Sequence, residues 1–155
     1  MQFLHSGQAG KHVLLFGARG SGKTSLGIGM GTELSIRHHT CSYTTSMKLL
    51  PLFFENQAPP SDKLWTWRNA SLLIIDDVNP GYPVAKDLVT PSIFLNFIDT
   101  LTRNEGNRET LRNKNTIWVL GNEDGEEARL DEWKMMLEEI GIERKNILPV
   151  NLSMG

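Results

Sequence analysis

The chain has 155 residues, 39% of them apolar and 22% charged, a composition typical of one globular domain rather than a disordered or fibrous chain. Its 16 basic and 18 acidic side chains give a net charge of −2 without a lysine or arginine run, so no basic nucleic-acid-binding patch is evident. No apolar run approaches the roughly 20 residues of a membrane span, the first residues do not predict a secretory signal, and Cys41 alone excludes an internal disulfide. We therefore expect one cytoplasmic domain over residues 1–155.

Predicted strands alternate with predicted helices, which favours a parallel sheet with helices on both faces. The predicted strands are residues 12–16, 40–45, 71–75, 116–121 and 146–152. The predicted helices are residues 24–36, residues 47–56 with Ser46 as N-cap and Pro51 limiting the length, a helix with Thr90 as N-cap and Pro91 as its first residue, and residues 126–140, ended by Gly141. The segment 103–115 is predicted to be a polar connection.

A glycine-rich motif follows the first predicted strand directly. The sequence GARGSGKT, residues 17–24, matches the P-loop pattern G-x-x-x-x-G-K-[ST]. Its glycines let successive N–H groups curl around a phosphate, and the next helix directs its positive end at the same anion. The residues expected to bind nucleotide are Gly17, Ala18, Arg19, Gly20, Ser21, Gly22, Lys23, Thr24 and Ser25. Among these, Lys23 is expected to contact the β- and γ-phosphates and to act in catalysis, and the Thr24 hydroxyl is expected to bind Mg²⁺.

Two aspartates end the most apolar predicted strand, in the sequence LLIIDD. Open α/β sheets bind their ligands at the carboxyl ends of the strands, so Asp76 and Asp77 are placed for the same site as the P-loop. We expect Asp76 to hold Mg²⁺ through water as the partner of Thr24, and Asp77 to orient or polarise the attacking water. The alternative is that the two acids simply end a strand and face solvent.

The order of P-loop, second strand, LLIIDD, polar linker, TIWVLGN and short last strand resembles the AAA+ ATPases over about residues 10–152. The likeness is greatest to the compact helicase-loader and transposition-helper group, which also carries an Asp-Asp pair. In this resemblance Asn122 corresponds to sensor 1, a polar side chain between the acids that reports on the γ-phosphate, or else it simply starts a loop. Arg144 lies where family members place an arginine finger for a neighbouring subunit; a plain surface arginine is an equal alternative, and Arg108 or Arg112 are others.

The resemblance implies an α/β, three-layer P-loop NTPase fold with a five-stranded parallel sheet of order 5-1-4-3-2. The helical lid usual in the family is expected to be absent, because the chain stops after its fifth strand. Asp77 replaces the usual glutamate with a shorter side chain. Both departures predict slow hydrolysis.

The predicted function is ATP binding and Mg²⁺-dependent hydrolysis, coupled to assembly with like or partner ATPase subunits or to remodelling of a macromolecular client. Nucleic acid is a possible partner, and a membrane is not. The main alternative is a nucleotide-gated binding module with little turnover. A small-molecule or nucleotide kinase is a third hypothesis, which lacks an arginine-rich acceptor lid. The absence of an N-K-x-D motif favours ATP over GTP.

Overall fold

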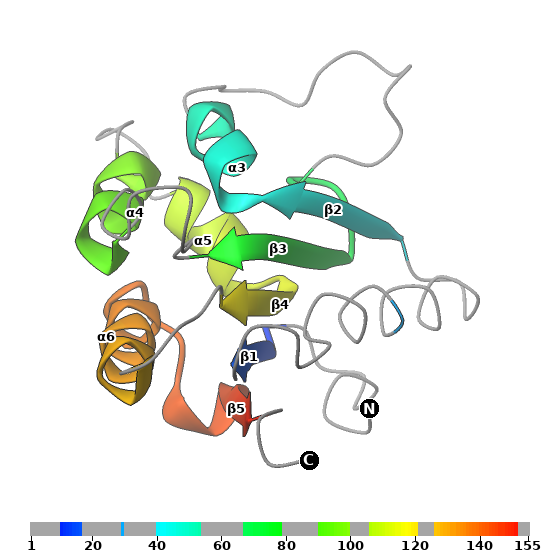
Figure 1. The fold of residues 1–155 in the computed structure, drawn as a ribbon. Helices are drawn as coiled ribbons and strands as arrows, with labels where there is room; N and C mark the ends of the chain where they lie inside the picture. Colours follow the sequence, from blue (N-terminus) through cyan, green and yellow to red (C-terminus); the bar gives the residue numbers. More distant parts are fainter. Residues whose placement is uncertain are drawn as a thin grey trace.

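The computed structural model describes residues 10–16, 29, 40–53, 67–78, 90–99, 106–120 and 126–151, with only the backbone for residues 77, 78, 126–129 and 151. Its five strands are β1 (His12–Phe16), β2 (Cys41–Thr45), β3 (Leu72–Val78), β4 (Asn115–Leu120) and β5 (Ile147–Asn151). They form one parallel sheet in the order β2-β3-β4-β1-β5, which confirms the predicted order 5-1-4-3-2 (Figure 1).

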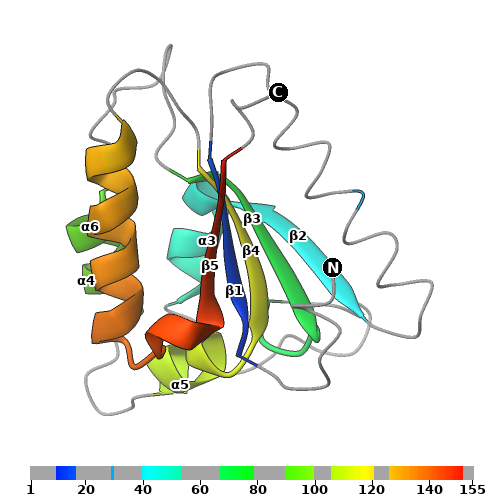
Figure 2. The ribbon, with the colours of Figure 1, turned by 90° about the horizontal axis from the view of Figure 1, so that it is seen from below.

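The described helices are α3 (Ser46–Leu52), α4 (Pro91–Ile98), α5 (Gly106–Arg112), α6 (Glu126–Glu139) and the short 3₁₀ helix η1 (Arg144–Asn146). Figure 2 shows α3, α4 and α6 on one face of the sheet, with α5 and η1 near the edge where the strands begin. On the other face, six apolar side chains from β1, β3 and β4 are each at most 2% exposed. A sheet buried on both faces is the arrangement that the three-layer prediction requires.

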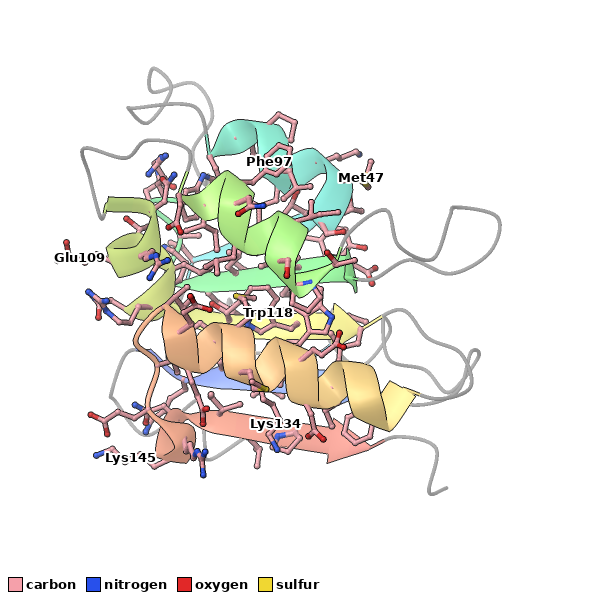
Figure 3. The ribbon with its side chains drawn as sticks, turned by 90° about the vertical axis from the view of Figure 1, so that its left-hand side faces the viewer. Met47, Phe97, Glu109, Trp118, Lys134 and Lys145 are labelled. Atoms are coloured by element: carbon pink, nitrogen blue, oxygen red, sulfur yellow. The ribbon has the colours of Figure 1, made fainter. Side chains whose placement is uncertain are left out.

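Five aromatic side chains join the helix layer to the sheet. Phe94 of α4 packs edge-on against Phe53, Trp118 and Trp133, with ring centroids 5.5, 5.3 and 5.7 Å apart. Trp67 packs edge-on against Phe53 at 5.1 Å. Figure 3 shows Trp118 behind α4 and α6, on the side of the sheet. Such edge-to-face pairs stabilise a core by about 0.5–1.5 kcal/mol each beyond the area that they bury.

His12 is fully buried at the beginning of β1, beneath this aromatic cluster. Its Nδ1 accepts a hydrogen bond from Trp118 Nε1 at 3.0 Å, so its Nε2 carries the proton and faces the Arg112 carbonyl at 3.4 Å. Burial lowers the pKa of His12 to about 4, because the charged imidazolium loses its water. His12 is therefore neutral in the folded protein at neutral pH.

The helix ends show which local predictions were correct. Thr90 is the N-cap of α4, accepting a hydrogen bond from Ile93 N at 3.2 Å, as predicted. Gly141 ends α6 with φ +102°, and an added Cβ there would lie 2.8 Å from the Arg112 side chain. The prediction for α3 was wrong in detail: Thr45 is its N-cap, and the helix ends at Leu52. Pro51, near its end, has no N–H with which to continue the helical ladder.

The segment predicted to be a polar connection contains α5, which its sequence does not suggest. Within α5 only Asn107 and Leu111 are buried, so no apolar stripe marks the helix. Tertiary hydrogen bonds hold it instead. Asn107 Nδ2 donates to the carbonyls of Phe53 and Ile98, at 2.9 and 3.1 Å, and its Oδ1 accepts from Arg68 Nη2 at 2.8 Å. This one side chain joins the ends of α3 and α4 to α5.

We expect Asn107→Ala to lower the free energy of unfolding by about 2 kcal/mol, because it leaves two buried carbonyls without their donor. Urea unfolding followed by tryptophan fluorescence measures the change. Asn113→Ala, at an exposed position just beyond α5, is the matched control and is expected to change stability by at most about 0.5 kcal/mol. Equal stability of the wild type and the Asn107 variant would contradict the joining role.

Candidate functional site

The carboxyl edge of the sheet is where the predicted site residues should converge. β1 ends there at Phe16, and the P-loop sequence comes next in the chain. One strand, β4, separates β1 from β3, which places these two strands about 10 Å apart. The P-loop residues, Gly17 to Ser25, and Asn122 lie outside the described residues. Their roles therefore stay predictions. The structure does describe the positions of the two strands that precede them, β1 and β4.

The acidic pair lies on an irregularity of the sheet rather than after its end. β3 continues to Val78, past the predicted end at residue 75. Between Ile75, which pairs with Trp118, and Val78, which pairs with Leu120, two residues of β3 oppose one of β4. These two residues are Asp76 and Asp77. Such bulges are frequent beside active sites, because the extra residue changes where side chains point.

Asp76 is almost completely buried, with 4% of its surface exposed. Tyr43, on the neighbouring strand β2, donates a hydrogen bond from its hydroxyl to Asp76 Oδ2. β2 and β3 stay in regular register through this point: Tyr43 pairs with Ile74, and Thr45 pairs with Asp76. Tyr43 and Asp76 are therefore diagonal neighbours, a separation that aromatic side chains span. The side chain of Asp77 lies outside the described residues, so its role stays a prediction.

The donor chemistry at Asp76 fits Mg²⁺. A carboxylate is a hard oxygen ligand, and Mg²⁺ usually takes only one or two protein ligands and keeps several waters. Among the residues that the structure describes, no group of three or more His, Cys, Asp or Glu side chains could enclose a metal. A site of the predicted kind, in which the Thr24 hydroxyl binds the metal and Asp76 holds it through water, needs no such group.

Arg144 lies at the opposite edge of the sheet from the predicted nucleotide site. It starts η1, directly before β5, and Figure 2 shows η1 at the edge where the strands begin. Its side chain is 88% exposed and its Nε donates to Glu138 Oε1 at 2.5 Å. An exposed ion pair of this kind contributes at most about 1 kcal/mol, so it does not hold the side chain firmly.

The other two candidate arginines are half-buried and are held by hydrogen bonds to other elements of the chain. Arg108 makes two hydrogen bonds of 2.6 Å to the Asp99 carboxylate and a third, of 3.3 Å, to the carbonyl of Glu139. Arg112 donates to the carbonyl of Ile140 at 3.1 Å. Both side chains fix α5 to neighbouring helices, which makes Arg144 the better finger candidate of the three.

A hollow of about 380 Å³ lies between α4 and α6. Its lining includes Leu95, Met135 and Met136, together with the carboxyl side chains of Glu132 and Glu139. Two carboxylates repel a triphosphate, so this hollow does not suit a nucleotide.

Comparison with known proteins shows which solved structures have a similar fold. No protein-family model matches the chain, and no curated protein matches it significantly. Solved structures do match: the DnaC helicase loader has a TM-score of 0.58 at 16% identity, over 96% of this chain and 83% of that one. DnaI has a TM-score of 0.57 at 19% identity, over 99% of this chain and 78% of that one.

The chain has the fold of the AAA+ P-loop ATPases. AMPPCP-bound DnaA from Aquifex aeolicus is also similar, with a TM-score of 0.54 at 17% identity, over 97% of this chain and 43% of that one. The chain therefore spans less than half of DnaA. The AAA+ fold, and the likeness to compact helicase loaders, were both predicted from the motifs. No helix in the described part of the chain is long and apolar enough to cross a membrane.

Sequence reasoning missed Tyr43. The segment TCSYTT was predicted to be a strand from its β-branched and aromatic residues, and nothing in it marked one side chain as part of the site. The signal appears only when β2 is paired with β3 in register, because Tyr43 then lies diagonally across from Asp76.

Proposed function

We propose that this chain is a single AAA+-type domain over residues 1–155 that binds ATP with Mg²⁺, hydrolyses it, and couples nucleotide state to assembly with like subunits or partner ATPases. One observation supports this most directly. The strand before the P-loop sequence and the strand that carries Asp76 and Asp77 are parallel and separated only by β4, so both segments reach the same edge of the sheet.

The proposed roles follow the chemistry of each side chain. The P-loop amides and Lys23 hold the phosphates, and Thr24 and Asp76 hold the metal. Asp77 and Asn122 orient water for attack on the γ-phosphate, and Mg²⁺, when bound, neutralises the charge that develops on the phosphate oxygens. The similarity to AMPPCP-bound DnaA supports nucleotide binding, and the similarity to the DnaC helicase loader supports a macromolecular client.

The proposed finger role of Arg144 requires assembly, because Arg144 would act on nucleotide bound to a neighbouring subunit. The five residues of β5, at about 3.3 Å each, put Arg144 about 16 Å from the edge where its own nucleotide would lie. An arginine side chain does not span that distance. Arg144 therefore reaches a γ-phosphate only in a neighbouring subunit, which makes turnover depend on protein concentration.

Lys23→Ala tests nucleotide binding itself. Because a hydrogen bond to a charged group contributes about 1.5–3 kcal/mol, we expect roughly 10- to 100-fold weaker binding of ATP with Mg²⁺. Isothermal titration calorimetry measures it. Lys134→Ala is the matched control, because it removes a lysine from α6, outside the P-loop sequence. Absence of heat from the folded wild type, or equal affinity of the Lys23 variant, would refute the proposal. Tight binding without phosphate release would instead identify a nucleotide-gated switch.

A further inference from the structure

We propose that Tyr43 is a positioning residue of the magnesium site, acting through Asp76. This inference rests on the proposed function, because it assigns a role toward the metal that the ATPase proposal requires. Its starting point is the hydrogen bond from the Tyr43 hydroxyl to Asp76 Oδ2, which joins two adjacent strands at the carboxyl edge of the sheet.

The carboxylate of Asp76 needs such a constraint. The terminal torsion of an aspartate has a broad energy profile, so the side chain by itself does not fix where its two oxygens point. Asp76 is 4% exposed, so bulk water does little to orient it. A hydrogen bond to an ionised acceptor is about twice as strong as one between neutral groups. The Tyr43 hydroxyl therefore favours the orientation in which Oδ2 of the carboxylate accepts its hydrogen bond.

The bulge explains why the constraint comes from β2. On the β4 side the ladder is interrupted at Asp76 and Asp77, where two residues oppose one. On the β2 side the register is unbroken through the pair of Thr45 and Asp76. The regular strand pairing at Asp76 is therefore the one on the β2 side. Tyr43 lies on β2, the strand that pairs regularly with β3 at this point. Its hydroxyl adds a side-chain hydrogen bond to the Asp76 carboxylate.

The hydrogen bond is compatible with metal binding. An ionised carboxylate has about four acceptor positions, so one donor does not exhaust its capacity for the waters around Mg²⁺. Partners that orient a metal ligand typically contribute 10- to 100-fold to metal affinity. Tyr43 would occupy this supporting position while remaining outside the metal's own ligand shell.

The experiment is a Mg²⁺ titration of ADP binding, followed with a fluorescent ADP analogue, in the wild type and in Tyr43→Phe. The substitution removes only the hydroxyl, and Tyr43 is 47% exposed on an outer strand, so the fold should tolerate it. Thermal unfolding checks this. Thr44→Val is the matched control: it removes a hydroxyl from the next residue of β2. Within the described part of the chain, Thr44 Oγ1 donates to a local carbonyl, that of Thr45.

We expect Tyr43→Phe to raise the Mg²⁺ concentration at half-saturation roughly 10- to 100-fold, with metal-free ADP affinity unchanged and Thr44→Val equal to the wild type. A double-mutant cycle with Asp76→Asn shows whether the effect passes through Asp76. In the Asn background, the Tyr43 substitution should then have little further effect on the midpoint.

The outcomes separate the two proposals. If the wild type binds ADP in a Mg²⁺-dependent way and Tyr43→Phe has the same midpoint, the positioning role is refuted and the proposed function stands. An undiminished effect of Tyr43→Phe in the Asp76→Asn background also refutes it. If the folded wild type binds no nucleotide, with or without Mg²⁺, the proposed function itself fails and this inference fails with it.

Discussion

Arg144→Ala is expected to lower ATP turnover by roughly 10³-fold while leaving ATP affinity nearly unchanged, the lower end of the range for an arginine finger. In the proposed mechanism, the planar guanidinium meets the γ-phosphate only in the assembled form, where it stabilises charge that develops during transfer. Phosphate release measured over a range of protein concentrations should rise more than linearly for the wild type. Arg144→Ala should lose this more-than-linear dependence of phosphate release on protein concentration.

Lys145→Ala is the matched control for Arg144→Ala. Lys145 is the next residue of η1, 75% exposed, and makes its own surface ion pair with Glu143 at 3.2 Å. Figure 3 shows Lys145 projecting from the end of the molecule at which η1 lies. Removing it changes the charge of η1 by the same amount without removing a guanidinium. Wild-type turnover is therefore expected for Lys145→Ala.

Mixing two inactive variants tests trans action directly. Lys23→Ala keeps Arg144 but is expected to lack an effective phosphate site, whereas Arg144→Ala keeps its P-loop but lacks the finger. In a mixture, some interfaces combine the intact P-loop of one chain with Arg144 of another, so phosphate release should reappear. Restored activity in the mixture would support the finger role. Full activity of Arg144→Ala alone would contradict it.

Acid is expected to destabilise the fold through His12, by about 3 kcal/mol between pH 7 and pH 4. This loss follows from the lowering of the His12 pKa from 6.5 to about 4, at 1.36 kcal/mol per pH unit. Below pH 6.5 the unfolded chain binds a proton at His12 that the folded chain does not. Stability contributed by neutral His12 is therefore complete above pH 6.5 and is lost as the pH falls toward 4.

His12→Gln is the variant that isolates this effect. A glutamine amide offers both an acceptor for Trp118 Nε1 and a donor for the Arg112 carbonyl, and it does not titrate. Urea unfolding at several pH values gives the free energy for both proteins. Subtracting the variant curve from the wild-type curve cancels the other titrating groups. A difference that stays constant between pH 7 and pH 4 would show that His12 is not buried as a neutral group.

The sequence alone determined the elements whose causes are local. The P-loop pattern, the alternation of strands and helices, the Thr90 cap and the Gly141 terminator each depend on a few adjacent residues, and every one of those that the structure describes was confirmed. The resemblance carried by these motifs was enough to predict the sheet order. The bounds of α3 were less accurate, because Thr45 and Ser46 are adjacent and both belong to the residue types that cap helices.

Only the tertiary structure decided the features that depend on contacts between distant segments. α5 forms because Asn107, Arg108 and Arg112 bond to partners on other elements, and its own sequence has no helical apolar stripe. The bulge under Asp76 and Asp77 is a mismatch between two strands, which neither strand records by itself. The Tyr43 contact and the distance of Arg144 from the nucleotide edge likewise depend on how the strands are paired. Local patterns specify elements, whereas register and packing between elements specify the site.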